Sequence, residues 1–307
     1  MSWNIGNLTG RISVVTGANG GLGLETAKAL AGAKSHVVMA VRDLDKAETA
    51  RREILRTHPE ASLELVATDL GSQESTKAAA SSIAHRHPKI DVLINNAGVM
   101  ALPEGRTVDG FETQLGINHL GHWTFTATLM PSLVAADRAR VVTVTSTARH
   151  QGRAVDPNDV NLEQGYSAWP AYGRSKLANF HFGMGLDAEF GRRGFSAQSL
   201  VAHPGLSNTD LQRHTVSQGG GGPAGPFFVW LAAKIGMSAA RGALPQLRAA
   251  TDPAARGGEL YGPRFGLHGR PVKLAVIRTE FDRDIAILWR VSEEMTGVRM
   301  FGDDDVT

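Results

Sequence analysis

The stretch "TGANGGLG", residues 16–23, decides the fold class because it joins a strand-like run to a helix-like run. The apolar, β-branched run "RISVVTG", residues 11–17, precedes it, and a helical pattern begins near Leu22. Glycines at such a junction let the backbone turn tightly and approach a pyrophosphate, which the free N–H groups of a helix start can bind. The stretch predicts a dinucleotide site, although an ordinary strand-to-helix turn has the same pattern.

Strand-like and helix-like runs continue to alternate along the chain. Helical patterns begin at about residue 22 and recur at about 46–56 and 74–85, in a long stretch that includes Asn118 and Trp123, and around Tyr172. The strand-like runs are "RISVVTG" (11–17), "HVVMAV" (36–41), "LELVATDL" (63–70), "DVLINNA" (91–97), "RVVTVTS" (140–146), "SAQSLVAHPG" (196–205) and "GELYG" (258–262). Continuous apolar strands are typical of a parallel sheet that is buried on both faces. We therefore expect one doubly wound, Rossmann-type α/β domain over residues 1–307, with helices on both faces.

Two long segments interrupt this alternation. Residues 147–171 form a polar insertion before the helix that contains Tyr172. Residues 206–236 follow a strand and include the glycine- and proline-rich run "QGGGGPAGP" at 218–226. Ligands of open α/β sheets bind at the carboxyl ends of the strands, so we expect 206–236 to be a flexible substrate lid.

Composition excludes several classes of protein. Hydrophobic residues make up 42% of the chain and charged residues 20%, as in ordinary folded proteins. The net charge of +2 comes from scattered residues, which argues against nucleic-acid binding, and the absence of cysteine excludes thiolate metal sites and disulfides. The apolar run at 227–237 contains Lys234 and is too short to span a bilayer, and no signal-peptide pattern opens the sequence. We expect a cytoplasmic protein without stable membrane insertion and without a metal centre.

The stretch "YGRSK", residues 172–176, places Tyr172 and Lys176 on one face of a helix. An ammonium group beside a tyrosine lowers the pKa of its hydroxyl, so Lys176 is expected to make Tyr172 a better proton donor and acceptor. Tyr166 lies in a loop-like context and is expected to line a substrate pocket. His119 and His122 share a helix face, where packing or hydrogen bonding is favoured over metal binding.

The motifs together resemble the short-chain dehydrogenase/reductase family. The resemblance rests on Gly17, Gly21 and Gly23 in a T-G-x-x-x-G-x-G pattern, on "NNAG" at 95–98 and on "PG" at 204–205. Asn118, Ser146, Tyr172 and Lys176 follow in the family's order, so the match spans roughly residues 11–210. "NHLGHW" at 118–123 and "YGRSKLAN" at 172–179 are similar to the retinol-dehydrogenase-like and protochlorophyllide-reductase-like branch.

The resemblance implies roles for these residues. Tyr172 would be the general acid and base, Ser146 would hold the substrate oxygen, Lys176 would also bind the nicotinamide ribose, and the freed carbonyl of Asn118 would bind a relay water. The implied dinucleotide site comprises Gly17, Asn19, Gly20, Gly21, Leu22, Gly23, Arg42, Asp69, Leu70, Asn96, Ala97, Gly98, Tyr172, Lys176, Pro204, Gly205 and Thr209.

The end of the second strand bears on the choice of nicotinamide cofactor. An NAD site usually presents a carboxylate there, whereas "MAVRD", residues 39–43, presents Val41 and then Arg42. Arginine binds phosphate in a bidentate manner, so NADP(H) is favoured, and NAD(H) remains possible because Asp43 is adjacent.

The sequence thus predicts an NADP(H)-dependent oxidoreductase that transfers a hydride between nicotinamide and a carbonyl or alcohol of a hydrophobic small molecule. The alternative is a catalytically silent, dinucleotide-binding regulator or scaffold. Both a monomer and a homo-oligomer are compatible with the sequence.

Overall fold

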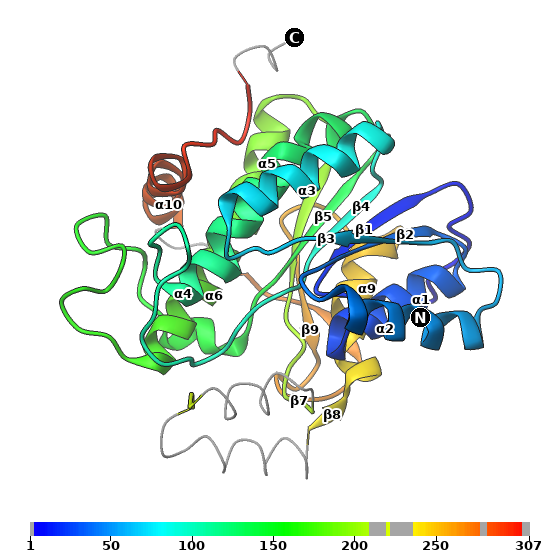
Figure 1. The fold of residues 1–307 in the computed structure, drawn as a ribbon, viewed down its shortest axis with the longest axis horizontal. Coiled ribbons are helices and arrows are strands. Elements are labelled where there is room, and N and C mark those ends of the chain that lie inside the picture. Colours follow the sequence, from blue (N-terminus) through cyan, green and yellow to red (C-terminus); the bar gives the residue numbers. More distant parts are fainter. Residues whose placement is uncertain (1–2, 209–218, 222–235, 277–280, 303–307) are drawn as a thin grey trace.

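The computed structural model describes residues 3–208, 219–221, 236–276 and 281–302 (Figure 1). The strands are β1 Ile12–Thr16, β2 His36–Val41, β3 Leu63–Ala67, β4 Val92–Asn95, β5 Arg140–Val144, β6 Gln198–Ala202, β7 Ser207–Asn208, β8 Met237–Ser238, β9 Leu260–Pro263 and β10 Pro271–Leu274. The helices are α1 Gly21–Gly32, α2 Leu44–Thr57, α3 Gln73–Arg86, α4 Thr113–Leu115, the π-helix η1 Gly116–Leu120, α5 Gly121–Val134, the 3₁₀ helix η2 Thr147–Gln151, α6 Ala168–Arg192, α9 Ala239–Thr251 and α10 Phe281–Thr296.

The main sheet has eight strands in the order β10-β9-β6-β5-β4-β1-β2-β3. Its pairs are parallel except for β9 with β10, which is antiparallel. The order reverses between β1 and β4, where an open α/β sheet forms a crevice at the carboxyl ends of its strands. The predicted doubly wound fold is confirmed, and the antiparallel β10 at the edge is an addition to it.

The sheet separates two hydrophobic cores because successive strand residues point to opposite faces. Val14 and Val38 pack with α3, α5 and α6, whereas Val15 and Met39 pack with α1, α2 and α9. Figure 1 shows these two helical layers on either side of the sheet. Burial on both faces explains why the strands read as continuous apolar runs.

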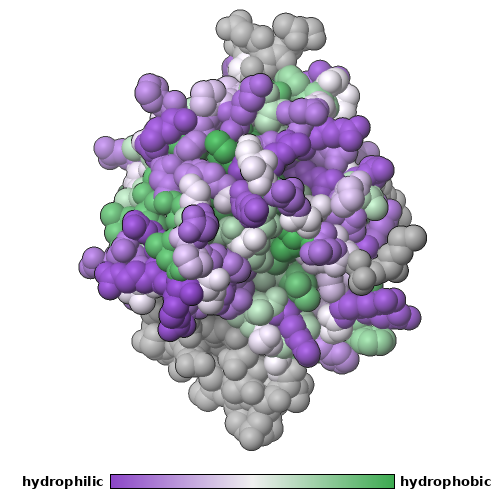
Figure 2. Space-filling model, turned by 90° about the vertical axis from the view of Figure 1, so that its right-hand side faces the viewer, coloured by the Kyte–Doolittle hydropathy of each residue, from purple (hydrophilic) through white to green (hydrophobic). Residues whose placement is uncertain are grey.

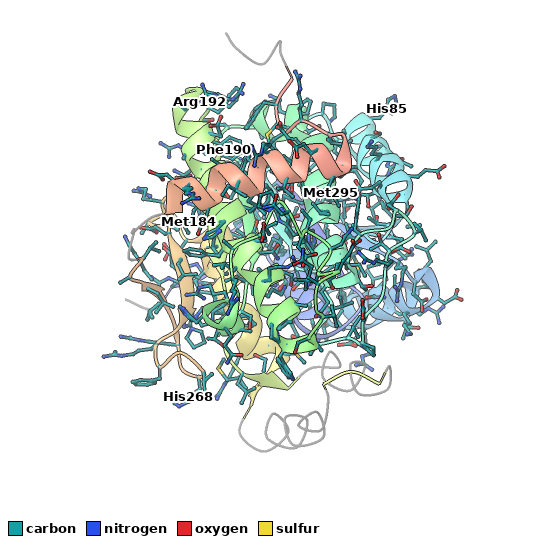
Figure 3. The ribbon with its side chains drawn as sticks, turned by 90° about the vertical axis from the view of Figure 1, so that its left-hand side faces the viewer. His85, Met184, Phe190, Arg192, His268 and Met295 are labelled. Atoms are coloured by element: carbon teal, nitrogen blue, oxygen red, sulfur yellow. The ribbon has the colours of Figure 1, made fainter. Side chains whose placement is uncertain are left out.

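The helix α10 closes the molecule on the α6 side. It lies across α6, as Figure 3 shows. The Nε2 atom of His119 is 2.8 Å from the Ser292 hydroxyl of α10, and the Trp123 and Trp289 rings meet edge to face at 4.9 Å. Packing and hydrogen bonding therefore occupy His119, as the sequence predicted.

The predicted long helix through Asn118 is not uniform. Residues Gly116–Leu120 form a π-helical turn between α4 and α5, and the Gly121 N–H bonds to the Gly116 carbonyl. A π-turn contains one more residue than an α-helical turn and is often found at functional sites. This irregularity surrounds Asn118.

The two interrupting segments differ from their expected extents. In the polar insertion 147–171, Thr147–Gln151 is a 3₁₀ helix and residues 168–171 already belong to α6, so the irregular part is shorter than predicted. Of the expected lid, residues 209–218 and 222–235 lie outside the described residues.

The surface in Figure 2 is mostly hydrophilic, and its hydrophobic residues form small separate groups. Within the described ranges, none of the helices combines the length and the apolar character needed to cross a membrane.

Candidate active site

A cavity of about 1110 Å³ opens at the carboxyl ends of the central strands. The glycine loop forms one wall of it. Gly17 and Gly21 have φ values of +66° and +51°, which favour glycine. At Gly23, a Cβ atom would lie 2.1 Å from the Gly17 carbonyl oxygen, so the start of α1 can approach the loop only without a side chain. These contacts explain the spacing of the three glycines.

The start of α1 is suited to an anion. Its N-cap, Gly20, provides no side-chain cap, and the first turn contains no acidic residue. A Cβ at Gly20 would meet nothing within 4 Å, so this part of the loop is open. The N–H groups at a helix start carry partial positive charge. The loop therefore fits the pyrophosphate of a dinucleotide.

Thr16 fixes the "NNAG" turn beside the glycine loop. Its hydroxyl accepts hydrogen bonds from the N–H groups of Asn96 (2.9 Å) and Ala97 (3.0 Å), and it lies 2.8 Å from His122 Nε2. Burial lowers the pKa of His122 to about 4, so its ring is neutral. Its Nδ1 donates to the Asn118 carbonyl at 2.9 Å, which leaves Nε2 to accept the Thr16 proton. A buried chain of hydrogen bonds thus supports the turn from below.

Tyr172, Ser146 and Lys176 meet at the inner end of the cavity. Tyr172 and Ser146 both line this end, and the Ser146 side chain acts to lower the pKa of the Tyr172 hydroxyl. The Lys176 ammonium donates to the Val144 carbonyl at 3.3 Å and lies 5.9 Å from the centre of the Tyr172 ring. Both Tyr172 and Lys176 are buried, with exposed fractions of 6% and 5%. The structure brings these three predicted residues together.

The pKa of Tyr172 shifts against the predicted direction. Burial raises the pKa of the Tyr172 hydroxyl to about 12, and the hydrogen bond from Ser146 offsets this only in part. The same burial lowers the pKa of Lys176 to about 8. In the protein alone the pKa of Tyr172 is therefore raised rather than lowered as expected, because removal from water disfavours the phenolate.

Asn118 lies behind the cavity wall and is completely buried. Its amide oxygen accepts from the Val99 N–H at 2.7 Å, and its amide nitrogen donates to the Val99 carbonyl and the Ser175 hydroxyl, both at 2.9 Å. Its main-chain carbonyl, expected to bind water, accepts from His122. The side chain of Asn118 thus holds the loop after "NNAG" against α6.

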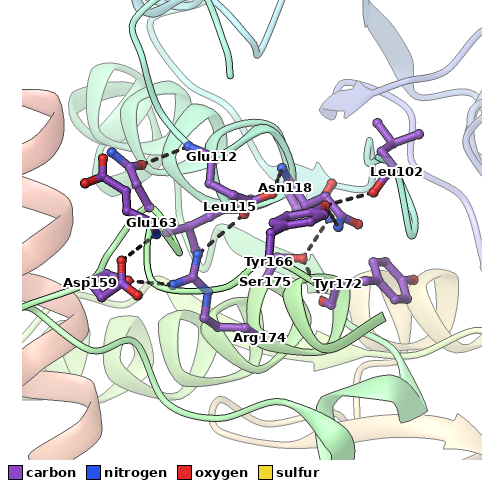
Figure 4. Close-up of polar contacts among 12 residues, drawn as sticks. Leu102, Glu112, Leu115, Asn118, Asp159, Glu163, Tyr166, Tyr172, Arg174 and Ser175 are labelled. Carbon is purple, nitrogen blue, oxygen red and sulfur yellow. Dashed lines mark hydrogen bonds and ion pairs between the residues drawn. The ribbon is translucent and has the colours of Figure 1, made fainter. Parts of the chain in front are cut away.

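A second polar network ties the insertion to the helix that carries Tyr172 (Figure 4). The Tyr166 hydroxyl donates to the Leu102 carbonyl and accepts from the Gln114 amide, each at 2.8 Å. The buried pair of Glu112 and Arg174 joins α4 to α6 at 3.5 Å. Among the described residues that line the cavity, Tyr166 is not included, and its hydroxyl is used in this network; its expected place in a substrate pocket stays a prediction.

The opposite, outer end of the cavity is charged. Arg42 and Lys46 both line it, and Arg42 is exposed. Asp43 caps α2 by accepting from the Lys46 N–H at 3.0 Å, and its other oxygen lies 3.6 Å from the Lys46 ammonium. The carboxylate that could have favoured NAD is therefore engaged with the start of α2.

Most predicted site residues line this cavity. The wall includes Gly17, Asn19, Gly20, Gly21, Leu22, Gly23, Arg42, Asp69, Leu70, Asn96, Ala97, Gly98, Ser146, Tyr172, Lys176, Pro204 and Gly205. Asn118 lies behind the wall, and Thr209 falls outside the described residues.

Sequence reasoning missed other lining residues, among them Lys46, Gln151, Trp169 and Leu267. Lys46 could have been found, because it lies four residues after Arg42 in the first turn of an expected helix. Trp169 lies three residues before Tyr172, and their rings meet edge to face at 6.1 Å. Leu267 follows the last predicted strand and carried no comparable signal.

Comparison with known proteins agrees with this geometry. A family model described as short chain dehydrogenase matches residues 11–219. Short-chain dehydrogenase/reductase prx1 from Penicillium roqueforti is 40% identical over 214 residues, which cover 68% of this chain and 61% of that protein. Retinol dehydrogenase 12 from Homo sapiens is 39% identical over 208 residues, which cover 68% of this chain and 65% of that protein. The chain thus covers less than two thirds of the length of these relatives.

A solved structure matches over nearly the whole chain. The crystal structure of an uncharacterized protein from Mycobacterium Paratuberculosis has a TM-score of 0.79 and 35% identity, and the match covers 98% of this chain and 100% of that one. The fold therefore extends through the carboxyl-terminal elements that the family model leaves out.

Proposed function

Since the chain belongs to the short-chain dehydrogenase/reductase family, we propose that it is an NADP(H)-dependent oxidoreductase that interconverts a carbonyl and an alcohol of a hydrophobic small molecule. Membership of this family supports an oxidoreductase of CH–OH or C=O groups that uses a nicotinamide dinucleotide. The observation that carries the proposal is that Ser146, Tyr172 and Lys176 line the same cavity as the glycine loop, with the Lys176 ammonium 5.9 Å from the centre of the Tyr172 ring.

In this proposal, Tyr172 transfers the proton. A hydroxyl with a pKa of about 12 stays protonated at neutral pH, so it can donate to an alkoxide that develops on a bound carbonyl. Ser146 donates a second hydrogen bond to the same oxygen and fixes its position.

The proposed dinucleotide site follows from the shape of the cavity. The bound dinucleotide would supply the hydride. The open N–H groups at the start of α1 bind its pyrophosphate, Asp69 and Leu70 contact its adenine side, and Lys176 bonds its inner ribose. Asn96, Ala97, Gly98, Pro204 and Gly205 line the space between, and Thr209 completes the proposed set.

The preference for NADP(H) rests on the outer end of the cavity. Arg42 and Lys46 are two cations at the end of β2, where a dinucleotide of this fold carries its 2′-phosphate. Asp43 does not oppose them, because its oxygens are engaged with the Lys46 N–H and ammonium.

The proposed substrate is hydrophobic. The cavity is lined by Val99, Met100, Trp169, Leu206 and Leu267 among other residues, and the Trp169 ring meets the Tyr172 ring edge to face at 6.1 Å. Apolar walls with a few convergent polar groups are typical of sites for apolar small molecules. The name of a relative, retinol dehydrogenase 12, points in the same direction.

A single domain over 1–307 and a cytoplasmic location are also part of the proposal. Limited proteolysis tests the single domain, and cell fractionation tests the location.

The test compares the parent protein with Tyr172→Phe. NADPH absorbance is followed with a panel of apolar ketones, quinones and aldehydes, including retinaldehyde. The parent should turn over at least one of them, and Tyr172→Phe should lower kcat about 10²–10⁴-fold because the proton donor is lost. The dissociation constant of NADPH should stay nearly unchanged.

Two outcomes would contradict the proposal. Full turnover in Tyr172→Phe would remove Tyr172 from its role. Tight NADPH binding without turnover of any compound in the panel would instead favour a silent regulator or scaffold.

A further inference from the structure

A cluster of two histidines and one glutamate lies at the amino ends of the strands, away from the cavity. His36 is the first residue of β2 and Glu64 the second residue of β3, both on the side of the sheet that α3 covers. The register pairs Val37 with Leu63 and Val38 with Glu64, so His36, Ser62 and Glu64 share one face. His87 is the residue at which α3 ends. Residues from three separate elements therefore converge at this point.

The potential ligand atoms of the cluster face one another. The Glu64 Oε2 atom lies 2.8 Å from His87 Nε2 and 3.5 Å from His36 Nε2. One ligand atom from each of the three residues lies within 4.8 Å of the other two. Zinc binds histidine nitrogen and carboxylate oxygen at about 2.0–2.2 Å, so modest side-chain movements would place all three around one ion. The side chains are 28%, 23% and 13% exposed for His36, Glu64 and His87, which gives an ion access.

The outer contacts of the cluster resemble those that orient metal ligands. The second ring nitrogen of His36, Nδ1, is 2.7 Å from the Ser62 hydroxyl, an arrangement that leaves Nε2 free to face Glu64. The second oxygen of Glu64, Oε1, accepts from Arg86 Nε at 2.8 Å. Hydrogen bonds to the outer atoms of histidine and carboxylate ligands fix their orientation and tune their basicity. Oε2 therefore remains the oxygen that both imidazoles share.

The charges at the cluster allow a cation to bind. The Glu64 carboxylate places a negative charge at the centre of the cluster, with Oε2 2.8 Å from His87 Nε2. Arg86 neutralises part of this charge and is the cation that an incoming metal would meet. Two imidazoles and one carboxylate form a donor set that zinc and its neighbours in the first transition row accept.

We propose that His36, Glu64 and His87 form a site for a divalent transition metal of the zinc class, which links β2, β3 and the end of α3. The six residues of β2 separate this site from the cavity by roughly 20 Å. The metal would therefore stabilise the packing of β2, β3 and α3 at the edge of the sheet and would take no part in hydride transfer. Three protein ligands leave a further position for water.

The experiment uses the full chain without an affinity tag, stripped of metal with a chelator. Calorimetric titration with zinc chloride should show one equivalent bound, and zinc should raise the Tm because it binds the folded state. Cobalt(II) added in place of zinc should give visible absorbance from the same site. His36→Ala, Glu64→Gln and His87→Ala should each weaken zinc binding by at least about tenfold, since each removes one of three ligands.

His85→Ala is the matched control, because His85 is exposed on the last turn of α3, two residues from His87 (Figure 3). It should bind zinc as the parent does. His36→Gln, which retains a polar side chain, and circular dichroism of each metal-free variant separate loss of a ligand from loss of the fold. The proposal is overturned if the parent shows no saturable binding below about 0.1 mM zinc. It is also overturned if folded His36→Gln and His87→Ala bind as the parent does, or if His85→Ala loses binding.

Discussion

The two ends of the cavity hold their functional groups in different ways. At the buried end, formed by Ser146, Tyr172 and Lys176, burial shifts the pKa values of the tyrosine and the lysine. At the charged end, formed by Arg42, Asp43 and Lys46, Arg42 reaches solvent. Under the proposed function, desolvation would govern reactivity at one end, whereas screened charges would govern cofactor preference at the other.

The largest effect is expected where the glycine loop joins the two ends. In Gly23→Ala, the new methyl group would overlap the Gly17 carbonyl oxygen and the Asn96 amide. We expect a loss of about 1–3 kcal/mol in the free energy of unfolding, because overpacking displaces backbone, together with loss of NADPH binding. Thermal unfolding and NADPH fluorescence measure the two effects.

Gly191→Ala is the control for this change. Gly191 lies near the end of α6, and a Cβ there would meet nothing within 4 Å. The alanine should stabilise the helix slightly. If Gly23→Ala were as stable as Gly191→Ala and bound NADPH normally, the close approach of Gly23 to Gly17 would not be needed for stability or for cofactor binding.

The next largest effect tests the charged end. Arg42→Ala should raise the dissociation constant of NADPH by about tenfold or more, since a charge-assisted hydrogen bond to phosphate is lost. NADH binding should change little, and the effect should shrink as salt is added. Lys46→Ala should act in the same direction. Arg52→Ala is the control, because Arg52 is an exposed cation of the same helix. Equal losses for NADPH and NADH would show that Arg42 does not read the 2′-phosphate.

A smaller effect is expected from pH at the buried end. Lys176 has a pKa of about 8, lowered by burial, so it is charged below pH 8 and neutral above it. Tyr172 stays protonated through this range. The rate of carbonyl reduction should therefore fall several-fold as pH rises through about 8. In Lys176→Arg, which keeps its charge, this decline should move to higher pH. A rate that stays constant to pH 10 in the parent would contradict the assignment.

The smallest effect is expected for Tyr166→Phe. Burial raises the pKa of Tyr166 to about 12, as it does for Tyr172, but the Tyr166 hydroxyl is bonded to Leu102 and Gln114 away from the cavity. Its removal should cost about 1–2 kcal/mol in the free energy of unfolding and leave kcat nearly unchanged. A loss of turnover comparable to that of Tyr172→Phe would show that the two tyrosines are not distinct in function.

Sequence patterns predicted the elements that depend on local order. Buried parallel strands are continuous apolar runs, so the strands from β1 to β6 were readable, and helical spacing placed Tyr172 beside Lys176. The glycine loop was readable because its geometry requires residues without side chains. Each of these features depends on residues close together in the sequence, so a local physical rule is enough to predict it.

The rest depends on contacts between distant parts of the chain. Lys46 and Trp169 line the cavity only because α2 and α6 begin beside it. The pKa of Tyr172 was predicted in the wrong direction because its burial comes from the whole fold. The antiparallel strand β10 was not predicted, because its four residues carry no clear strand pattern of their own. It is defined by its pairing with β9.

The π-turn at Gly116–Leu120 limits how this chain can be aligned with others for chimera construction or redesign. It contains one surplus residue, and every later position of α5 is rotated by about 100° relative to an uninterrupted α-helix. Deleting one residue here would rotate His122 away from Thr16 and Trp123 away from Trp289. A chimera that aligns residues 113–134 as a plain α-helix would therefore present the wrong face of α5 to the sheet, although its amino-acid composition would hardly differ.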